Sequence, residues 1–193
     1  MTHTHALRLL GIDPGLQRTG WGLISIQGNT TRHLAHGIIQ TKTKDPLAQR
    51  LAHIAASLEN IIDTHQPHEA AIEDIFMNNN AASTLKLGMA RGIGLMVPAS
   101  KGLPVFEYGA NHVKKMIVGV GHADKSQVAM MVQRFLPTAG AVNKDAADAL
   151  AVALCHCHSR LIHGQIPSKP QALTQASKRQ SSKSLVSQES FCT

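Results

Sequence analysis

The sequence is poor in several residue types, and each shortage excludes a class of protein. Its three cysteines, two of them nearly adjacent at Cys155 and Cys157, do not make a disulfide framework, so we expect a reducing, cytoplasmic environment. No segment approaches the roughly 20 apolar residues that span a bilayer. The first residues do not have the pattern of a signal peptide. We therefore expect no membrane location.

Charged residues are also sparse, at 16% of the 193 residues, yet lysine and arginine outnumber aspartate and glutamate by 19 to 12. The resulting net charge of +7 favours a polyanionic partner, either nucleic acid or a membrane surface. Part of this charge belongs to residues 161–193, where Ser, Gln and Lys dominate and aromatic residues almost vanish. We predict one domain over residues 1–160, followed by a mostly disordered basic tail over 161–193.

Hydrophobic periodicity and turn residues predict the elements of this domain. Strands are expected over residues 7–13, 21–28, 32–41, 68–76 and 103–108. Helices are expected over residues 45–65, 80–100, 110–117, 124–136 and 143–158, and Asp45 can cap the first of them. Strands interleaved with helices in this order predict an α/β fold, in which a mixed five-stranded sheet is flanked by helices on both faces.

Four carboxylates stand out because each lies beside apolar sequence. Asp13 and Glu73 end two predicted strands, where sites in sheets flanked by helices tend to lie. Asp145 and Asp148 share one face of the last helix, and neither has a basic residue at i+4. Acids buried together need compensation, which divalent cations with oxygen ligands supply. The set favours Mg²⁺ or Mn²⁺ over zinc, and two such ions can hydrolyse a phosphodiester.

Each acid also has a plainer interpretation. Asp145 can satisfy the helix N-terminus and its dipole, and Asp13 can belong to the turn that begins at Pro14. Glu73 can be an exposed strand end, and Asp74 beside it competes for any role. Taken one by one, these positions are ambiguous, and only their combination in this order is specific.

The remaining motifs do not indicate another chemistry. Cys-His-Cys-His at 155–158 is no zinc site, because four consecutive helical residues point in different directions. Within it, His156 either approaches the carboxylates or, more commonly, lies at a helix end near the negative pole of the dipole. The segment GIDPG does not have the spacing of a phosphate-binding loop, and Ser126 has no evident base.

Four segments resemble the RuvC family of Holliday-junction resolvases, in the family's order: LGIDPGLQRTGWG, AIEDIFMNNNAASTLKLGMARG, VKKMIVGVGHADKSQVAMMV and DAADALAVALCHCH. The likeness covers residues 7–158. It implies a ribonuclease H-like fold, a homodimer, and Mg²⁺-dependent nicking of two opposed strands at a four-way DNA junction. It also implies cooperation with the junction-migration proteins RuvA and RuvB.

The resemblance assigns roles to individual residues. The implied metal ligands, for two ions per subunit with Mn²⁺ able to replace Mg²⁺, are Asp13, Glu73, Asp145 and Asp148. Some members of the family have histidine at the position of Asp145, so this chain has an all-acidic set. Lys114 and Lys125 resemble basic residues that the family needs near its active site, and their expected role is catalytic contact with the scissile-strand phosphates.

Three further residues are candidates for DNA contact. Phe76, one of six aromatic residues, can stack on unpaired bases at a branch point, as the resemblance implies, or can belong to the core. Lys86 and Arg91 lie on the helix after Glu73 and either contact phosphates or form a solvated face. The segment MNNN departs from family patterns that often place a lysine nearby.

Three other functions compete with a junction endonuclease. A phosphotransferase of the actin and sugar-kinase type shares a Gly-Ile-Asp turn but needs a duplicated domain, for which 193 residues leave no room. A junction-binding module without catalysis does not need four acids. A related nuclease acting on RNA differs in its treatment of the 2′-hydroxyl, which the sequence does not show.

Overall fold

The protein is described here by a computed structural model over residues 6–74, 81–120 and 124–163. One sheet contains five strands: β1 (Leu7–Asp13), β2 (Arg18–Gln27), β3 (Thr30–Gln40), β4 (Glu69–Asp74) and β5 (Val105–Gly109). They lie in the order β3-β2-β1-β4-β5. β1, β2 and β3 are antiparallel neighbours, whereas β4 and β5 continue the sheet parallel to β1. The predicted mixed five-stranded sheet is confirmed.

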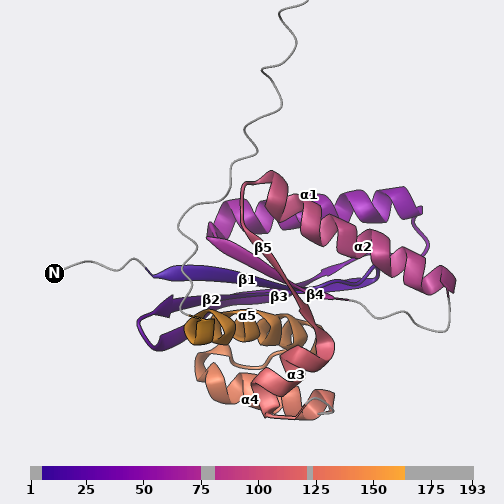
Figure 1. Ribbon diagram of the computed structural model, residues 1–193. Coiled ribbons are helices and arrows are strands. Elements are labelled where there is room, and N and C mark those ends of the chain that lie inside the picture. Colours follow the sequence, from indigo (N-terminus) through magenta and orange to yellow (C-terminus); the bar gives the residue numbers. More distant parts are fainter. Residues whose placement is uncertain (1–5, 75–80, 121–123, 164–193) are drawn as a thin grey trace, which may run out of the picture.

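Helices cover both faces of this sheet, as Figure 1 shows. The helices α1 (Leu47–His65) and α2 (Ala81–Ser100) lie on one face. The other face is covered by α3 (Ala110–Val118), α4 (Lys125–Phe135) and α5 (Lys144–His163). β1 is apolar on both sides because Leu9 enters the core under α5, while Leu10 and Ile12 enter the core under α1 and α2.

Several element boundaries differ from the sequence expectation. β2 begins at Arg18 and not at residue 21, because Gly20 already pairs with Asp13 across the sheet. Asp45 does not cap α1: Pro46 occupies the N-cap position without a side-chain cap, and the backbone N–H of Asp45 closes a turn onto Lys42. The sequence could not distinguish a turn from a cap at adjacent residues.

The chain ends also bear on the predicted domain boundary. α5 continues to His163, beyond the boundary placed at residue 160, and the predicted tail beyond it lies outside the described residues.

Within the described part of the chain, no helix is both long enough and apolar enough to cross a membrane.

Candidate active site

Two predicted site residues meet at the ends of neighbouring parallel strands. Asp13 is the last residue of β1, and Glu73 is the last but one of β4. Ile12 is paired with Ile72, so the next residue of each strand falls at the same level of the sheet. The two carboxyl groups are close enough for each to affect the pKa of the other. The predicted convergence of these two acids is therefore present in the structure.

Helix α5 brings a third carboxylate, that of Asp148, close to Asp13 and Glu73. The helix can approach the sheet closely because the strand residues under it are glycines. A Cβ on Gly20 would lie 2.0 Å from the carbonyl oxygen of Asp145, and one on Gly11 would lie 2.1 Å from that of Ala149. A Cβ on Gly22 would collide with Leu150 at 2.6 Å. The first turns of α5 consequently rest on the backbone of β1 and β2.

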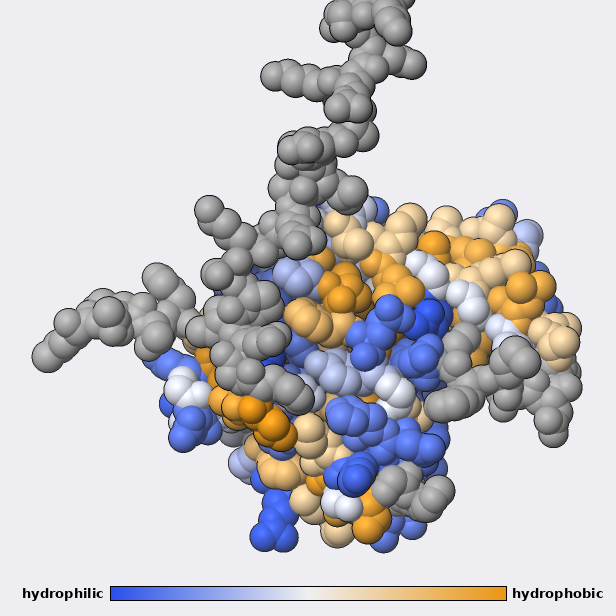
Figure 2. Space-filling view, in the orientation of Figure 1, coloured by the Kyte–Doolittle hydropathy of each residue, from blue (hydrophilic) through white to orange (hydrophobic). Residues whose placement is uncertain are grey.

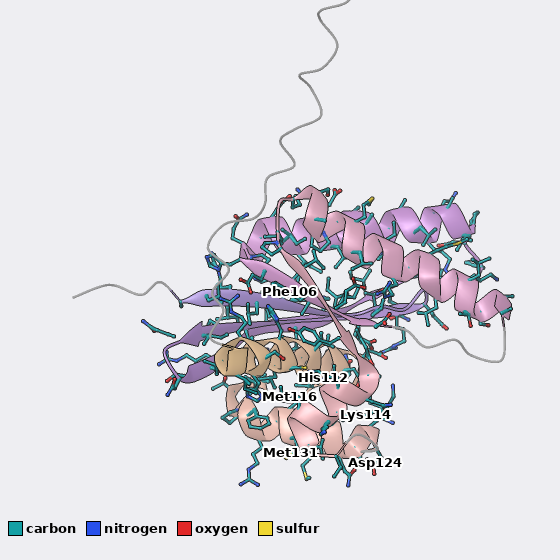
Figure 3. The ribbon with its side chains drawn as sticks, viewed as in Figure 1. Phe106, His112, Lys114, Met116, Asp124 and Met131 are labelled. Carbon is teal, nitrogen blue, oxygen red and sulfur yellow. The ribbon has the colours of Figure 1, made fainter. Side chains whose placement is uncertain are left out.

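The carboxylates border a cavity of about 460 Å³ together with two lysines. Its charged lining residues, besides Asp74, are Asp13, Glu73, Asp148, Lys114 and Lys125. Lys125 is the first residue of α4, and its Nζ donates to Asp148 Oδ2 at 3.1 Å. Figure 3 shows Lys114 on α3 near Asp124, the residue that caps α4. The structure thus brings five of the predicted site residues to one cavity.

Burial and the neighbouring carboxylates both raise the pKa values of the two strand acids. Burial, followed by the charges of Glu73 and Asp148, raises the pKa of Asp13 from 3.8 to about 8. Burial and the charge of Asp148 likewise raise the pKa of Glu73. The nearby carboxylate of Asp148 raises the pKa of the Lys125 ammonium. The cluster lacks positive charge, and a divalent cation would supply it.

The donor set fits a hard cation, although its ligands are not yet gathered around one point. All four predicted ligands offer oxygen, which Mg²⁺ and Mn²⁺ prefer. Among the described acidic, imidazole and thiol side chains, no three are already arranged to hold a single ion. Asp145 does not line the cavity, and its Oδ2 accepts a hydrogen bond from Arg18 Nε at 2.5 Å.

The remaining predicted contacts fall at different places. Lys86 is exposed on α2. Arg91 is engaged by two carboxylates, at 3.0 Å from Asp74 and in a short contact with Glu107. Phe76 lies outside the described residues, so neither its wedge role nor its core role is tested. Arg91 thus has acidic partners within its own chain, whereas Lys86 points to solvent.

Sequence reasoning missed two groups. Arg18 precedes the strand predicted from residue 21, and its acidic partner is 127 residues away in the sequence. Glu69, at the start of β4, binds both His156 and Arg160 of α5, and the hydroxyl of Tyr108 bonds the other ring nitrogen of His156. His156 therefore lies neither at the carboxylates nor at an exposed helix end. A weak signal was available, because Glu69 is an acid inside an apolar strand.

Comparison with known proteins decides the family. The family model described as Crossover junction endodeoxyribonuclease RuvC matches residues 9–156. The chain belongs to the RuvC family. A curated RuvC from Allorhizobium ampelinum is 51% identical over 157 residues, which cover 81% of this chain and 93% of that protein. The RuvC of Caulobacter vibrioides is 48% identical over 159 residues, or 82% of this chain and 94% of the relative.

Solved structures agree with the sequence relatives. The RuvC of Thermus thermophilus in complex with Holliday junction substrate has a TM-score of 0.74 and 32% identity, over 80% of this chain and 96% of that one. The yeast mitochondrial resolvase Ydc2, at 15% identity and a TM-score of 0.58, shares the fold. The predicted ribonuclease H-like fold is confirmed, as is the assignment to the crossover junction endodeoxyribonucleases, which are hydrolases that cut DNA junctions.

Proposed function

We propose that this RuvC protein cuts a four-way DNA junction by hydrolysing one phosphodiester in each of two opposed strands, with Asp13, Glu73, Asp145 and Asp148 holding Mg²⁺. The observation that carries the proposal is the convergence of Asp13, Glu73 and Asp148 at one cavity with a raised pKa at Asp13. Such a buried cluster of acids costs stability unless a cation occupies it. A group of acids that lowers the stability of the metal-free protein is expected at a functional site and not in a structural core.

Two Mg²⁺ ions per subunit, or Mn²⁺ in their place, are the proposed cofactors. When bound, such ions make a water molecule nucleophilic at neutral pH and stabilise the leaving oxygen. Asp13 and Glu73 would offer their oxygens from strand ends whose backbones are held in place by pairing within the sheet. Asp148 holds its oxygen on α5, whose position the glycines of β1 and β2 set.

The two lysines of the cavity have separate proposed roles. Lys125 neutralises Asp148 in the metal-free protein and also acts electrostatically on Asp13 and Glu73. Lys114, on α3, offsets part of the rise that burial and Asp148 cause in the pKa of Glu73. We propose that both contact the scissile phosphate and that one stabilises the charge of its transition state. Phe76, two residues after the end of β4, is proposed to stack on junction bases, and Lys86 to contact a phosphate.

A second copy of the chain is the proposed partner of α2. Leu85, Met89 and Met96 of this helix are large, exposed apolar side chains spaced to share one face. Figure 2 shows hydrophobic residues along the α2 region of the surface. Gly92, between Met89 and Met96, has open space at its Cβ position, so another backbone can approach. A two-fold dimer matches a junction of near two-fold symmetry and places one cavity at each cut strand.

Family membership supports two further proposals. The chain is proposed to act with RuvA and RuvB. It is also proposed to act in the cytoplasm. Cys155 and Cys157 are free, buried thiols, and burial raises the pKa of Cys155 to about 12, which suits a structural role in a reducing compartment.

Cleavage of a labelled synthetic four-way junction tests the proposed function, with linear duplex as the control substrate. We expect paired, symmetric nicks in Mg²⁺, none in EDTA, and no cutting of the duplex. Asp13→Asn and Asp148→Asn should each lower the cleavage rate by about a thousandfold, equivalent to about 4 kcal/mol, while junction binding persists. The matched control is Asp63→Asn, which changes an exposed aspartate of α1 that pairs with Lys101.

Two results would contradict the proposal. Tight junction binding without cleavage in either Mg²⁺ or Mn²⁺ would indicate a binding module. Equal cleavage by the wild type and by Asp13→Asn would place the chemistry elsewhere in the molecule.

A further inference from the structure

The ion pair between Arg18 and Asp145 lies beside the cavity. Both residues fall in segments that resemble the RuvC family, but the resemblance gives Arg18 no role of its own. Arg18 is the first residue of β2, and its Nε donates to Asp145 Oδ2 at 2.5 Å. Its side chain is 44% exposed and that of Asp145 is 28% exposed, so water reaches both partners. The contact exists because Gly20, two residues along β2, lets the backbone of Asp145 rest on that strand.

The pair holds one predicted ligand apart from the others. Asp13, Glu73 and Asp148 line the cavity, whereas Asp145 does not. Asp145 is nevertheless close enough to raise the pKa of Asp13, and it contributes less than Glu73 or Asp148 does. Asp145 is therefore a near neighbour of the cluster whose carboxylate is already occupied.

The second cation at the site acts differently. Lys125 also binds an acid of α5, but it lines the cavity and acts on Asp13 and Glu73 as well as on Asp148. Lys125 can therefore offset the negative charge of the carboxylates whether or not a metal is bound. Arg18 lies outside the cavity lining, and its acidic contact within the described part of the chain is with Asp145.

We propose that Arg18 is a positioning residue that competes with the second metal ion for Asp145. In the metal-free protein its guanidinium occupies the carboxylate, and the second ion binds only by displacing it. The released guanidinium is then free for a backbone phosphate, the anion that its planar fork fits best. This inference rests on the proposed role of the four carboxylates as metal ligands.

Chemistry and exposure make the exchange feasible. A solvent-exposed ion pair is weak, so a divalent cation can displace the guanidinium without a large cost. Asp145 lies in the first turn of α5, where a side-chain rotation changes what its carboxylate faces without moving the helix.

Mn²⁺ binding without DNA tests the exchange, by titration calorimetry and by the loss of the electron paramagnetic signal of free Mn²⁺. The variant is Arg18→Gln, and the matched control is Arg32→Gln, an exposed arginine of β3 whose strand position is paired with Ser25. We expect Arg18→Gln to tighten the weaker of two Mn²⁺ sites about fivefold, because it removes an exposed competitor. Arg32→Gln should match the wild type. Adding Asp145→Asn to Arg18→Gln should abolish the weaker site.

The outcomes separate this inference from the function on which it rests. A wild type that binds no Mn²⁺ and does not cut the junction would overturn the proposed function. Two Mn²⁺ sites in the wild type with no change in Arg18→Gln would overturn only the competition. Weaker binding in a folded Arg18→Gln, as judged by its circular dichroism spectrum, would also overturn it, because Arg18 would then be holding Asp145 in a ligating position.

Discussion

The two ends of helix α5 both carry charged pairs, but they differ in their access to water. At the N-terminal end Asp145 and Asp148 meet Arg18 and Lys125, whose side chains are 44% and 68% exposed. At the C-terminal end His156 and Arg160 share Glu69, and all three side chains are at most 14% exposed. At the N-terminal end, water or ions can replace the cationic partners of the two aspartates. At the C-terminal end, the partners of Glu69 are buried and solvent does not compete with them.

The buried end fixes the helix that carries the exposed end. His156 Nε2 lies 2.8 Å from Glu69 Oε2, and its Nδ1 lies 2.7 Å from the hydroxyl of Tyr108. The ring of Phe106 packs against His156 at a centroid distance of 4.3 Å. These contacts tie α5 to β4 and β5, the strands that lead to Glu73 and the cavity. The buried network around Glu69 therefore holds in place the helix that carries the exposed ion pairs of Arg18 and Lys125.

The largest effect is expected from breaking the buried network. Glu69→Ala leaves Arg160 and His156 without their acid, so we expect the free energy of unfolding to fall by about 3 kcal/mol in urea denaturation. The contrasting change is Asp63→Asn, which breaks the exposed Lys101 pair and should cost less than about 1 kcal/mol. Similar losses in both variants would mean that burial does not distinguish the two kinds of pair.

The contribution of Glu69 to the stability of the folded protein should decrease as the pH falls. Although burial opposes it, the hydrogen bond from His156 and the charge of Arg160 lower the pKa of Glu69 below 4.5 in the folded protein. An acid with a depressed folded pKa contributes stability above its unfolded pKa and loses it as the pH falls through the folded value. The contribution of Glu69 should therefore be complete at neutral pH and absent in strong acid.

The opposite sign is expected at Asp13, in a metal-free protein. The unfolded chain loses this proton near its ordinary pKa of 3.8, whereas the folded protein keeps it to about 8. Between these values the unfolded state binds fewer protons, so stability should fall as the pH rises. Water in the cavity screens the carboxylate charges, so we expect the free energy of unfolding to fall by only about 2 kcal/mol over this pH range.

Urea denaturation in EDTA at a series of pH values measures this slope. Asp13→Asn removes the titrating group, so the variant should be more stable than the wild type near the upper end of the range. Mg²⁺ should flatten the slope of the wild type without altering that of the variant to the same degree. A wild type whose stability rises with pH in EDTA would show that Asp13 is not held protonated.

The sequence predicted the elements and the strand-end acids because these depend on local pattern. The apolar run that ends at Asp13 and the one that ends at Glu73 are readable as strands, and parallel pairing then brings the acids together. The helical spacing of Asp145 and Asp148 added the acids of the last helix, and the family motifs added roles for the two lysines. What the sequence could not supply were pairings between distant residues, such as Arg18 with Asp145, or Glu69 with His156.

Those pairings depend on how closely elements pack, which composition does not reveal. Gly20 and Gly22 alternate with larger residues in β2, a pattern equally consistent with a turn or a weak strand. Only the packing of α5 shows that they provide a surface for that helix. His156 was misread for a related reason: α5 continues to His163, so what the sequence presents as a helix end is a buried helix interior.

The smallest effect, and the sharpest test of the comparison, is the coupling free energy within each kind of pair. A double-mutant cycle with Arg18→Gln and Asp145→Asn in EDTA should give about 0.5 kcal/mol at low salt and nearly nothing at about 1 M salt, because exposed charges are screened. The same cycle with Arg160→Gln and Glu69→Gln should give a larger value that salt barely changes, since ions do not enter that network. If salt weakened both couplings equally, the buried end would be as replaceable as the exposed one, and α5 would need another anchor.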